Sequence, residues 1–136
     1  MIKDISFLKV DDLALAMAPR LVFEENHEDF WDAYLLNLKD EPINSVIVSA
    51  TGYGEIEGIP RRTTSLRYFW EQIAPRTVVR IEPVSKAVFA LTSEYWVSFM
   101  YKGYLYDKKY LFVPGIFDEM HFCEIPILQR QGVMIR

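Results

Sequence analysis

The stretch WDAYLLNLKDEPINSVIVSAT, residues 31–51, decides the fold that this sequence predicts. Large apolar side chains occupy every second position in each half, which is the period of a β-strand. These positions are Tyr34, Leu36, Leu38, Val46, Val48 and Ala50. The polar segment 39–42 between the halves ends in Pro42, which fixes φ and lacks an N–H group for a ladder hydrogen bond. We therefore expect two antiparallel strands joined by a turn.

Similar alternation continues on both sides of this stretch. Residues 10–18 place large residues at odd positions and alanines at even positions, which favours a strand covered on both faces. A helix is the alternative for this segment, because alanine and leucine have high helix propensity. Residues 77–82 alternate up to Pro83, which should end the strand. Shorter strands are predicted at 120–124 and 132–135.

A second hairpin is predicted between residues 95–101 and 104–113. The two runs flank Lys102-Gly103, a two-residue turn in which the glycine can adopt positive φ. Aromatic side chains alternate along both runs, and they favour half-buried strands. In the second run, alternation sends Asp107 and Lys109 to one face and Lys108 to the other. Lysine at such positions is a common protection of an exposed edge strand.

One helix is predicted from Thr64 to Ile73. Its apolar residues recur at i, i+3, i+4 and i+7, which makes one stripe along a helix. This stripe consists of Leu66, Phe69, Trp70 and Ile73. Thr63 or Thr64 would supply the N-cap oxygen, and Pro75 would close the element. The stripe should pack against a sheet.

These elements predict a mostly β protein. Six to seven short strands with turn signals between them are typical of an antiparallel immunoglobulin-like β sandwich, here with one inserted α-helix. A partly open barrel capped by the helix is the alternative. The chain has 136 residues, 51% of them hydrophobic and 25% charged, which predicts one globular domain spanning residues 1–136.

Charge and cysteine content restrict the classes of function. The net charge of −4 disfavours general nucleic-acid binding, because phosphate backbones are repelled by a negative field. Cys123 is the single cysteine, so an intrachain disulfide is excluded and a reducing compartment is expected. Charged residues interrupt the apolar residues of the segment 1–19, and no stretch reaches the length of a membrane span. We expect a cytoplasmic protein with no membrane contact.

The sharpest candidate site combines a glycine-rich loop with an arginine cluster. Gly52–Gly58 contains three glycines around Tyr53, and its spacing matches no phosphate-binding fingerprint. Three arginines with neighbouring hydroxyls would surround the start of the predicted helix, and this combination favours an anion such as a phosphate or carboxylate. These ligand-binding residues are Tyr53, Arg61, Arg62, Thr64, Ser65 and Arg67. The alternative is a solvated basic turn in which Arg67 pairs with Glu71.

Catalytic and metal-binding patterns are weak. His121 and Cys123 would share a face of a strand, but two ligands do not make a metal site, and His27 lies in a separate polar segment. Neither the serines nor Cys123 falls in the spacing of a nucleophilic triad. We therefore predict no catalytic residue, no metal and no cofactor.

Four motifs resemble a group of small bacterial proteins of unknown function. They are LNLKDEPI at 36–43, GYGEI at 52–56, TTSLRYFW at 63–70 and YDKKYLFVPG at 106–115. The resemblance covers about residues 31–115. Some members of the group carry the label of a phenylalanyl-tRNA synthetase beta chain, but this chain has neither the length nor the domain set of that subunit. The resemblance therefore implies no activity and transfers no site residue.

The sequence favours a non-enzymatic binding or protein-interaction domain, with a homodimer through an aromatic strand face as one form of that interaction. Nine Phe, eight Tyr and three Trp residues, together with arginine, suit a protein interface. The alternative is a small protein or enzyme that holds an anionic ligand with the Gly52–Gly58 loop and the three arginines.

Overall fold

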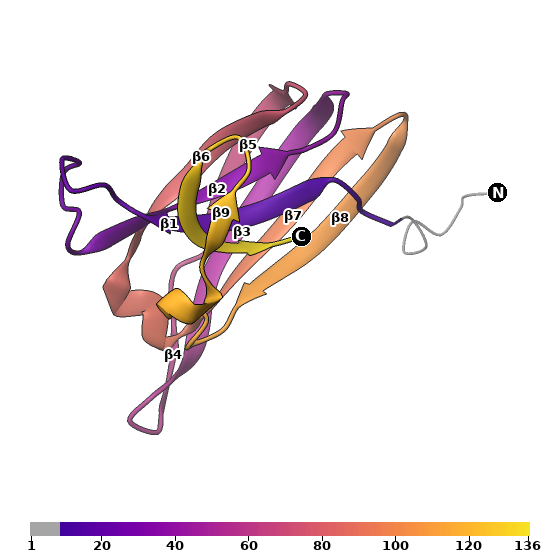
Figure 1. The fold of residues 1–136 in the computed structure, drawn as a ribbon. Coiled ribbons are helices and arrows are strands. Elements are labelled where there is room, and N and C mark those ends of the chain that lie inside the picture. The colour runs from indigo at the N-terminus through magenta and orange to yellow at the C-terminus, as the bar shows by residue number, and fades with distance from the viewer. Residues whose placement is uncertain (1–8) are drawn as a thin grey trace.

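The computed structural model describes residues 9–136, and these residues form two antiparallel β-sheets. The first sheet has the strand order β6-β2-β1-β10-β9, and the second has the order β4-β3-β7-β8, with β5 also paired to β3. Figure 1 shows the two sheets lying one over the other as two layers. Residues 1–8, part of the segment 1–19 in which charged residues interrupt the apolar ones, lie outside the described residues.

The strand bounds follow the alternating pattern of the sequence. The strands of the first sheet are β1 (Leu13–Pro19), β2 (Phe30–Asn37), β6 (Thr77–Ser85), β9 (Cys123–Ile125) and β10 (Arg130–Ile135). The strands of the second are β3 (Ile43–Ile56), β4 (Ile59–Arg62), β5 (Leu66–Ile73), β7 (Thr92–Tyr101) and β8 (Tyr104–Phe112). Two short 3-10 turns, η2 (Lys86–Ala90) and η3 (Glu119–His121), lie in the connections.

The predicted hairpin over residues 31–51 is wrong. Its two strands exist, but β2 pairs with β1 and β6, whereas β3 pairs with β4, β5 and β7. The connection 38–42 therefore carries the chain from one sheet to the other. This connection is held by Asn37, whose side-chain amide donates hydrogen bonds to the carbonyls of Glu41, Ile73 and Ala74.

The predicted helix at 64–73 is also wrong, because this segment is the strand β5. The strand pairs with β3 from Ile43↔Ile73 to Ala50↔Leu66. Three consecutive aromatic residues at 68–70 favour an extended backbone, and the neighbouring strand β3 supplies hydrogen-bond partners. Residues 9–136 contain 3-10 turns but no α-helix.

The glycine-rich segment is a regular hairpin rather than an irregular loop. β3 continues through Ile56, and β4 returns along it with the pairs Tyr53↔Arg62 and Ile56↔Ile59. The turn is formed by Glu57 and Gly58, both with positive φ. β4 and β5 thus follow one another along the same edge of β3.

Other predictions are confirmed. β1 is a strand with both faces buried, as the alanine and leucine alternation indicated. β7 and β8 form the predicted hairpin, and both Lys102 and Gly103 have positive φ, as a type I′ turn requires. β6, however, continues past Pro83, because β6 is an edge strand and one side of it needs no ladder hydrogen bonds.

The two sheets enclose one main apolar core. β1 and β2 contribute Leu15 and Leu35 from the first sheet, and β7 and β8 contribute Phe99 and Tyr110 from the second. A smaller core lies on the outer side of the first sheet, where the chain between β9 and β10 covers the alanines of β1. Gly132 permits this arrangement, since a Cβ atom there would collide with the carbonyl oxygen of Met17.

Candidate functional site

The structure separates the arginines of the predicted anion site. Arg61 pairs with Gly54 and Arg62 pairs with Tyr53 across the β3–β4 hairpin, so the two arginines project to opposite faces of this ribbon. Arg67 lies on β5 opposite Ser49. All three arginines are exposed. The structure therefore places Tyr53 beside Arg62 but does not bring Arg61 and Arg62 together.

Thr64 and Ser65 lie in the short link between β4 and β5. Ser65 Oγ lies 2.7 Å from Thr51 Oγ1 on β3, so the two hydroxyl groups are hydrogen-bonded to each other. The free amides of a helix N-terminus, which the anion site required, are absent because the segment following this link is the strand β5. The anion site expected from the sequence therefore lacks the helix N-terminus on which it depended.

A cleft of about 160 Å³ opens between the two sheets beside this link. Thr64 is the one predicted ligand-binding residue that lines this cleft. Its neighbours Gly52 and Thr63 also line it. The cleft contains Glu82 of β6, and none of its described lining residues is basic. Its charge does not favour an anion.

Glu82 connects the two sheets at this cleft. Tyr68 of β5 and Tyr95 of β7 donate hydrogen bonds of 2.6 Å and 2.8 Å to its two carboxylate oxygens. Burial, followed by the bond to Glu82, raises the pKa of Tyr68 to about 12. Burial also raises the pKa of Tyr95 far above its ordinary value. Both phenols therefore stay neutral at physiological pH, and the cluster cross-links the layers.

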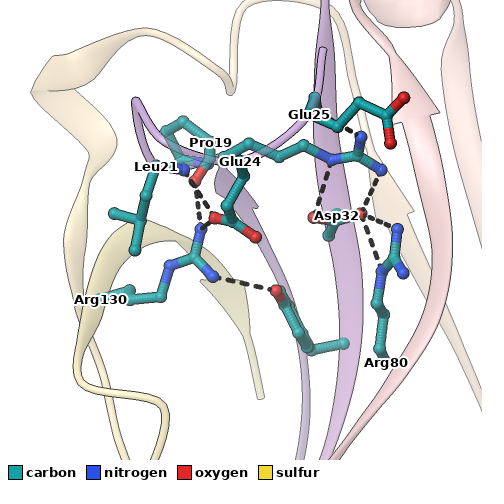
Figure 2. Close-up of polar contacts among 9 residues, drawn as sticks. Pro19, Leu21, Glu24, Glu25, Asp32, Arg80 and Arg130 are labelled. Atoms are coloured by element: carbon teal, nitrogen blue, oxygen red, sulfur yellow. Dashed lines mark hydrogen bonds and ion pairs between the residues drawn. The ribbon is translucent and has the colours of Figure 1, made fainter. Parts of the chain in front are cut away.

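A second polar cluster, not identified from the sequence, surrounds Asp32 on β2 (Figure 2). Asp32 is buried and accepts hydrogen bonds from Arg20 to both carboxylate oxygens, at 3.0 Å and 3.1 Å. Arg80 of β6 donates two further bonds to Oδ1. Arg20 Nη1 also donates to the carbonyl of Glu25. Arg20 and Asp32 are therefore hydrogen-bonded within the cluster.

Arg130 of β10 extends the same cluster. It donates to the Pro19 carbonyl and to Glu24 Oε1, at 2.7 Å and 3.0 Å, as Figure 2 shows. Arg130 Nη1 also lies 3.2 Å from the Tyr34 hydroxyl. These contacts tie the connection between β1 and β2 to the last strand. The arrangement stabilises the fold and leaves few donors for a ligand.

The pair considered for a metal lies at the end of the chain. His121 belongs to η3, whereas Cys123 begins β9. Among residues 9–136, no group of three or more His, Cys, Asp or Glu side chains is arranged to hold a metal ion.

Large apolar side chains are exposed on the outer face of the second sheet. Phe69 on β5, Ile47 on β3 and Trp96 on β7 are 63%, 42% and 44% exposed. Leu105 and Leu111 on β8 are exposed at the opposite edge of the sheet. Ile47 and Phe69 lie directly opposite one another across the β3–β5 ladder, and exposed apolar side chains grouped on one face are typical of interaction sites. We call the outer face of β5, β3, β7 and β8 the exposed sheet face.

Charged residues surround the apolar side chains of the exposed sheet face. The Lys109 Nζ lies 5.2 Å from the centre of the Trp96 ring and 3.9 Å from Glu94 Oε1. Arg67 and Asp107 lie on the two outer strands, β5 and β8. Aromatic residues and arginine are enriched at protein interfaces. The sequence signal for this face was the alternation of β7 and β8, which sends their tyrosines inward and Trp96 and Lys109 outward.

The fold and this face define a two-layer antiparallel β protein with exposed apolar side chains on the outer face of one sheet. No family model, no curated protein and no solved structure matches the chain. Over the part of the chain that the structure describes, helices of the length and apolarity needed to cross a membrane are not found.

Proposed function

We propose that this protein is a non-enzymatic protein-interaction domain that binds its partner through the exposed sheet face. The observation that carries the proposal is the grouping of Phe69, Ile47 and Trp96 on one open sheet, each more than two-fifths exposed. Burying such side chains against a partner is favourable by about 25 cal/mol per Å² of apolar surface. Large aromatic residues at the centre of a face commonly dominate the binding energy.

The fold class we propose is immunoglobulin-like. We take β1, β2 and β3 as strands A, B and C, β5 as C′, and β6, β7 and β8 as E, F and G. The first sheet then contains the order E-B-A, and the second contains C′-C-F-G. The immunoglobulin class distributes its strands in this way, with C′ added beside C. β9 and β10 then extend the first sheet beyond A. This order supports a scaffold that presents one sheet to a partner.

The experiment compares complexes formed in the cell of origin. A tagged chain is separated by size in a fresh extract, and its elution is compared with that of a Phe69→Arg, Trp96→Arg double variant. We expect the wild type to elute in a complex larger than its 16.0 kDa mass. The double variant should elute at monomer size, because two buried unpaired charges oppose binding.

Arg61→Glu is the matched control, because Arg61 is exposed on β4, outside the exposed sheet face. It should leave the elution of the complex unchanged. Thermal unfolding by circular dichroism checks that all three proteins fold. Elution of the wild type as a monomer, or of the double variant in the same complex as the wild type, rejects the proposed function.

A further inference from the structure

The exposed sheet face is organised in two central rows that cross all four strands. The strand registers place Arg67, Ser49, Trp96 and Lys109 in the first row. They place Phe69, Ile47, Ser98 and Asp107 in the second row. Residues directly opposite on neighbouring strands project to the same side of a sheet, so both rows face outward. Each row carries a charged residue on β8, and the two charges are opposite.

We infer that the partner is a second copy of this chain, docked face to face with its two-fold axis running across the strands between the two rows. The inference rests on the proposed function and names its partner. In this arrangement each strand lies over its own counterpart and runs in the opposite direction. The first row of one copy then lies over the second row of the other.

This axis makes the exposed sheet face complementary to itself. Lys109 lies opposite Asp107 of the second copy, and symmetry repeats the ion pair. Arg67 lies opposite Phe69 of the second copy, where a guanidinium can stack on the aromatic ring. One register step further out, the row containing Leu111 lies over the row containing Leu105, so that apolar contacts border the charged pairs. Interfaces with the same patch on both subunits require this kind of complementarity.

The charges also disfavour the other in-plane axis. A two-fold axis parallel to the strands, between β3 and β7, would place Arg67 opposite Lys109 of the second copy. It would also place Phe69 opposite Asp107. Like charges facing one another across an interface oppose binding, so the pattern of this face favours the axis that crosses the strands.

The side chains are prepared for such contacts. Lys109 is held over Trp96 and near Glu94, which keeps its ammonium group on the exposed sheet face. Among the ion pairs formed within residues 9–136, Asp107 takes part in none. Its carboxylate therefore has no competing basic partner within the described chain.

The size of the face suits a small dimer interface. Four strands, each about 4.8 Å wide, and four rows, each about 6.8 Å deep, give an area of roughly 19 by 27 Å. This corresponds to about 500 Å² on each copy, or about 1,000 Å² in total, before side-chain relief is counted. Specific interfaces begin near this size.

The test uses charge exchange at Asp107 and Lys109 in the purified full chain. Asp107→Lys places two positive residues on β8 and Lys109→Asp places two negative ones, so each variant should repel its own copies. We expect the dissociation constant of each to rise at least about tenfold over the wild type, by sedimentation or light scattering. An equimolar mixture of the two should form a heterodimer, and the double exchange Asp107→Lys, Lys109→Asp should restore the homodimer.

Lys108→Asp is the control, because Lys108 lies between these positions and projects to the opposite face of β8. It changes the net charge by the same amount as Lys109→Asp and should leave the dimer intact. The inference is overturned if the wild type is a monomer at about 100 μM, or if the mixture and the double exchange fail to dimerise. A wild-type monomer whose cellular complex still depends on Phe69 and Trp96 would point to a different protein partner and leave the proposed function standing. A wild type that is a monomer both when purified and in the cell extract would reject the homodimer and the proposed function together.

Discussion

At the scale of single residues, Asp32 is the most constrained charge in the described chain. Its side chain is 3% exposed and is paired with Arg20, which is 12% exposed, and with Arg80, which is 52% exposed. The bond to Asp32 raises the pKa of Arg20, so the guanidinium stays charged at every accessible pH. A buried charge of this kind depends on all of its partners, because an unpaired charge in the interior is costly.

We expect Asp32→Asn to lower the free energy of unfolding by about 3 kcal/mol, near the lower end for breaking a buried ion pair, because Arg80 can still reach water. Arg20 would lose its charged partner while remaining largely buried. Urea unfolding followed by circular dichroism measures the change. Asp40→Asn is the control, since the exposed pair of Asp40 with Arg76 contributes less than about 1 kcal/mol. Equal effects from the two substitutions would contradict the structural role of Asp32.

The sequence gives only a partial signal for this cluster. Asp32 is the one charged residue in β2, a strand whose other residues are mostly apolar, and this pattern indicates a paired buried charge. Its partners lie 12 and 48 residues away, and pairing at such distances depends on which strands become neighbours. Arg61, Arg62 and Arg67 are close in sequence, which predicted one cluster, yet the strand geometry sends Arg61 and Arg62 to opposite faces.

At the scale of elements, β5 shows why periodicity alone was misleading. Leu66, Phe69, Trp70 and Ile73 fit a helical stripe, but only Ile73 is fully buried. In the strand, Phe69 faces solvent beside Ile47, while Trp70 packs against the core from the other face. Spacing cannot distinguish these two patterns when apolar residues occupy both faces of an edge strand. The exposed face of β5 belongs to the proposed interface.

Substitutions in β5 distinguish a strand from a helix. We expect Ile73→Ala to lower the free energy of unfolding by about 2–5 kcal/mol, because it removes fully buried methyl groups. Phe69→Ala should cost under about 1 kcal/mol in the monomer, because its side chain is 63% exposed. Denaturant unfolding at low protein concentration measures both. Comparable losses would indicate that both side chains face the core, as in the helix.

The strands of residues 31–51 were predictable, but their partners were not. Alternation at Leu36 and Val48 identifies two extended segments, and the polar residues between them identify a connection. Whether that connection closes a hairpin or crosses between sheets depends on contacts such as Asn37 with Ala74, 37 residues away. Sequential strands often pair, and this prior favoured the hairpin. By contrast, the two-residue turn at Lys102 admits only a hairpin, and that prediction is confirmed.

At the scale of the whole molecule, the cluster of Glu82, Tyr68 and Tyr95 joins the two sheets. Glu82 belongs to the first sheet, and the two tyrosines belong to the second. Both phenols have a pKa above the value of about 10 found in an unfolded chain. Their neutral form is therefore favoured by folding, and the contribution of the cluster to stability is fully present below pH about 10.

As the pH rises above about 10, the unfolded chain releases tyrosine protons that the folded chain retains, so the free energy of unfolding decreases. The part of this decrease that belongs to Tyr68 ends as the pH passes about 12, whereas the part that belongs to Tyr95 continues to higher pH. We expect the melting temperature to fall steeply over this range, with the absorbance of tyrosinate from these residues appearing together with unfolding. The Tyr68→Phe variant should have a shallower decline, because one of the linked protons is gone. Tyr104→Phe is the control, since Tyr104 is half exposed. Parallel declines in all three proteins would show that the link between the sheets does not depend on these protons.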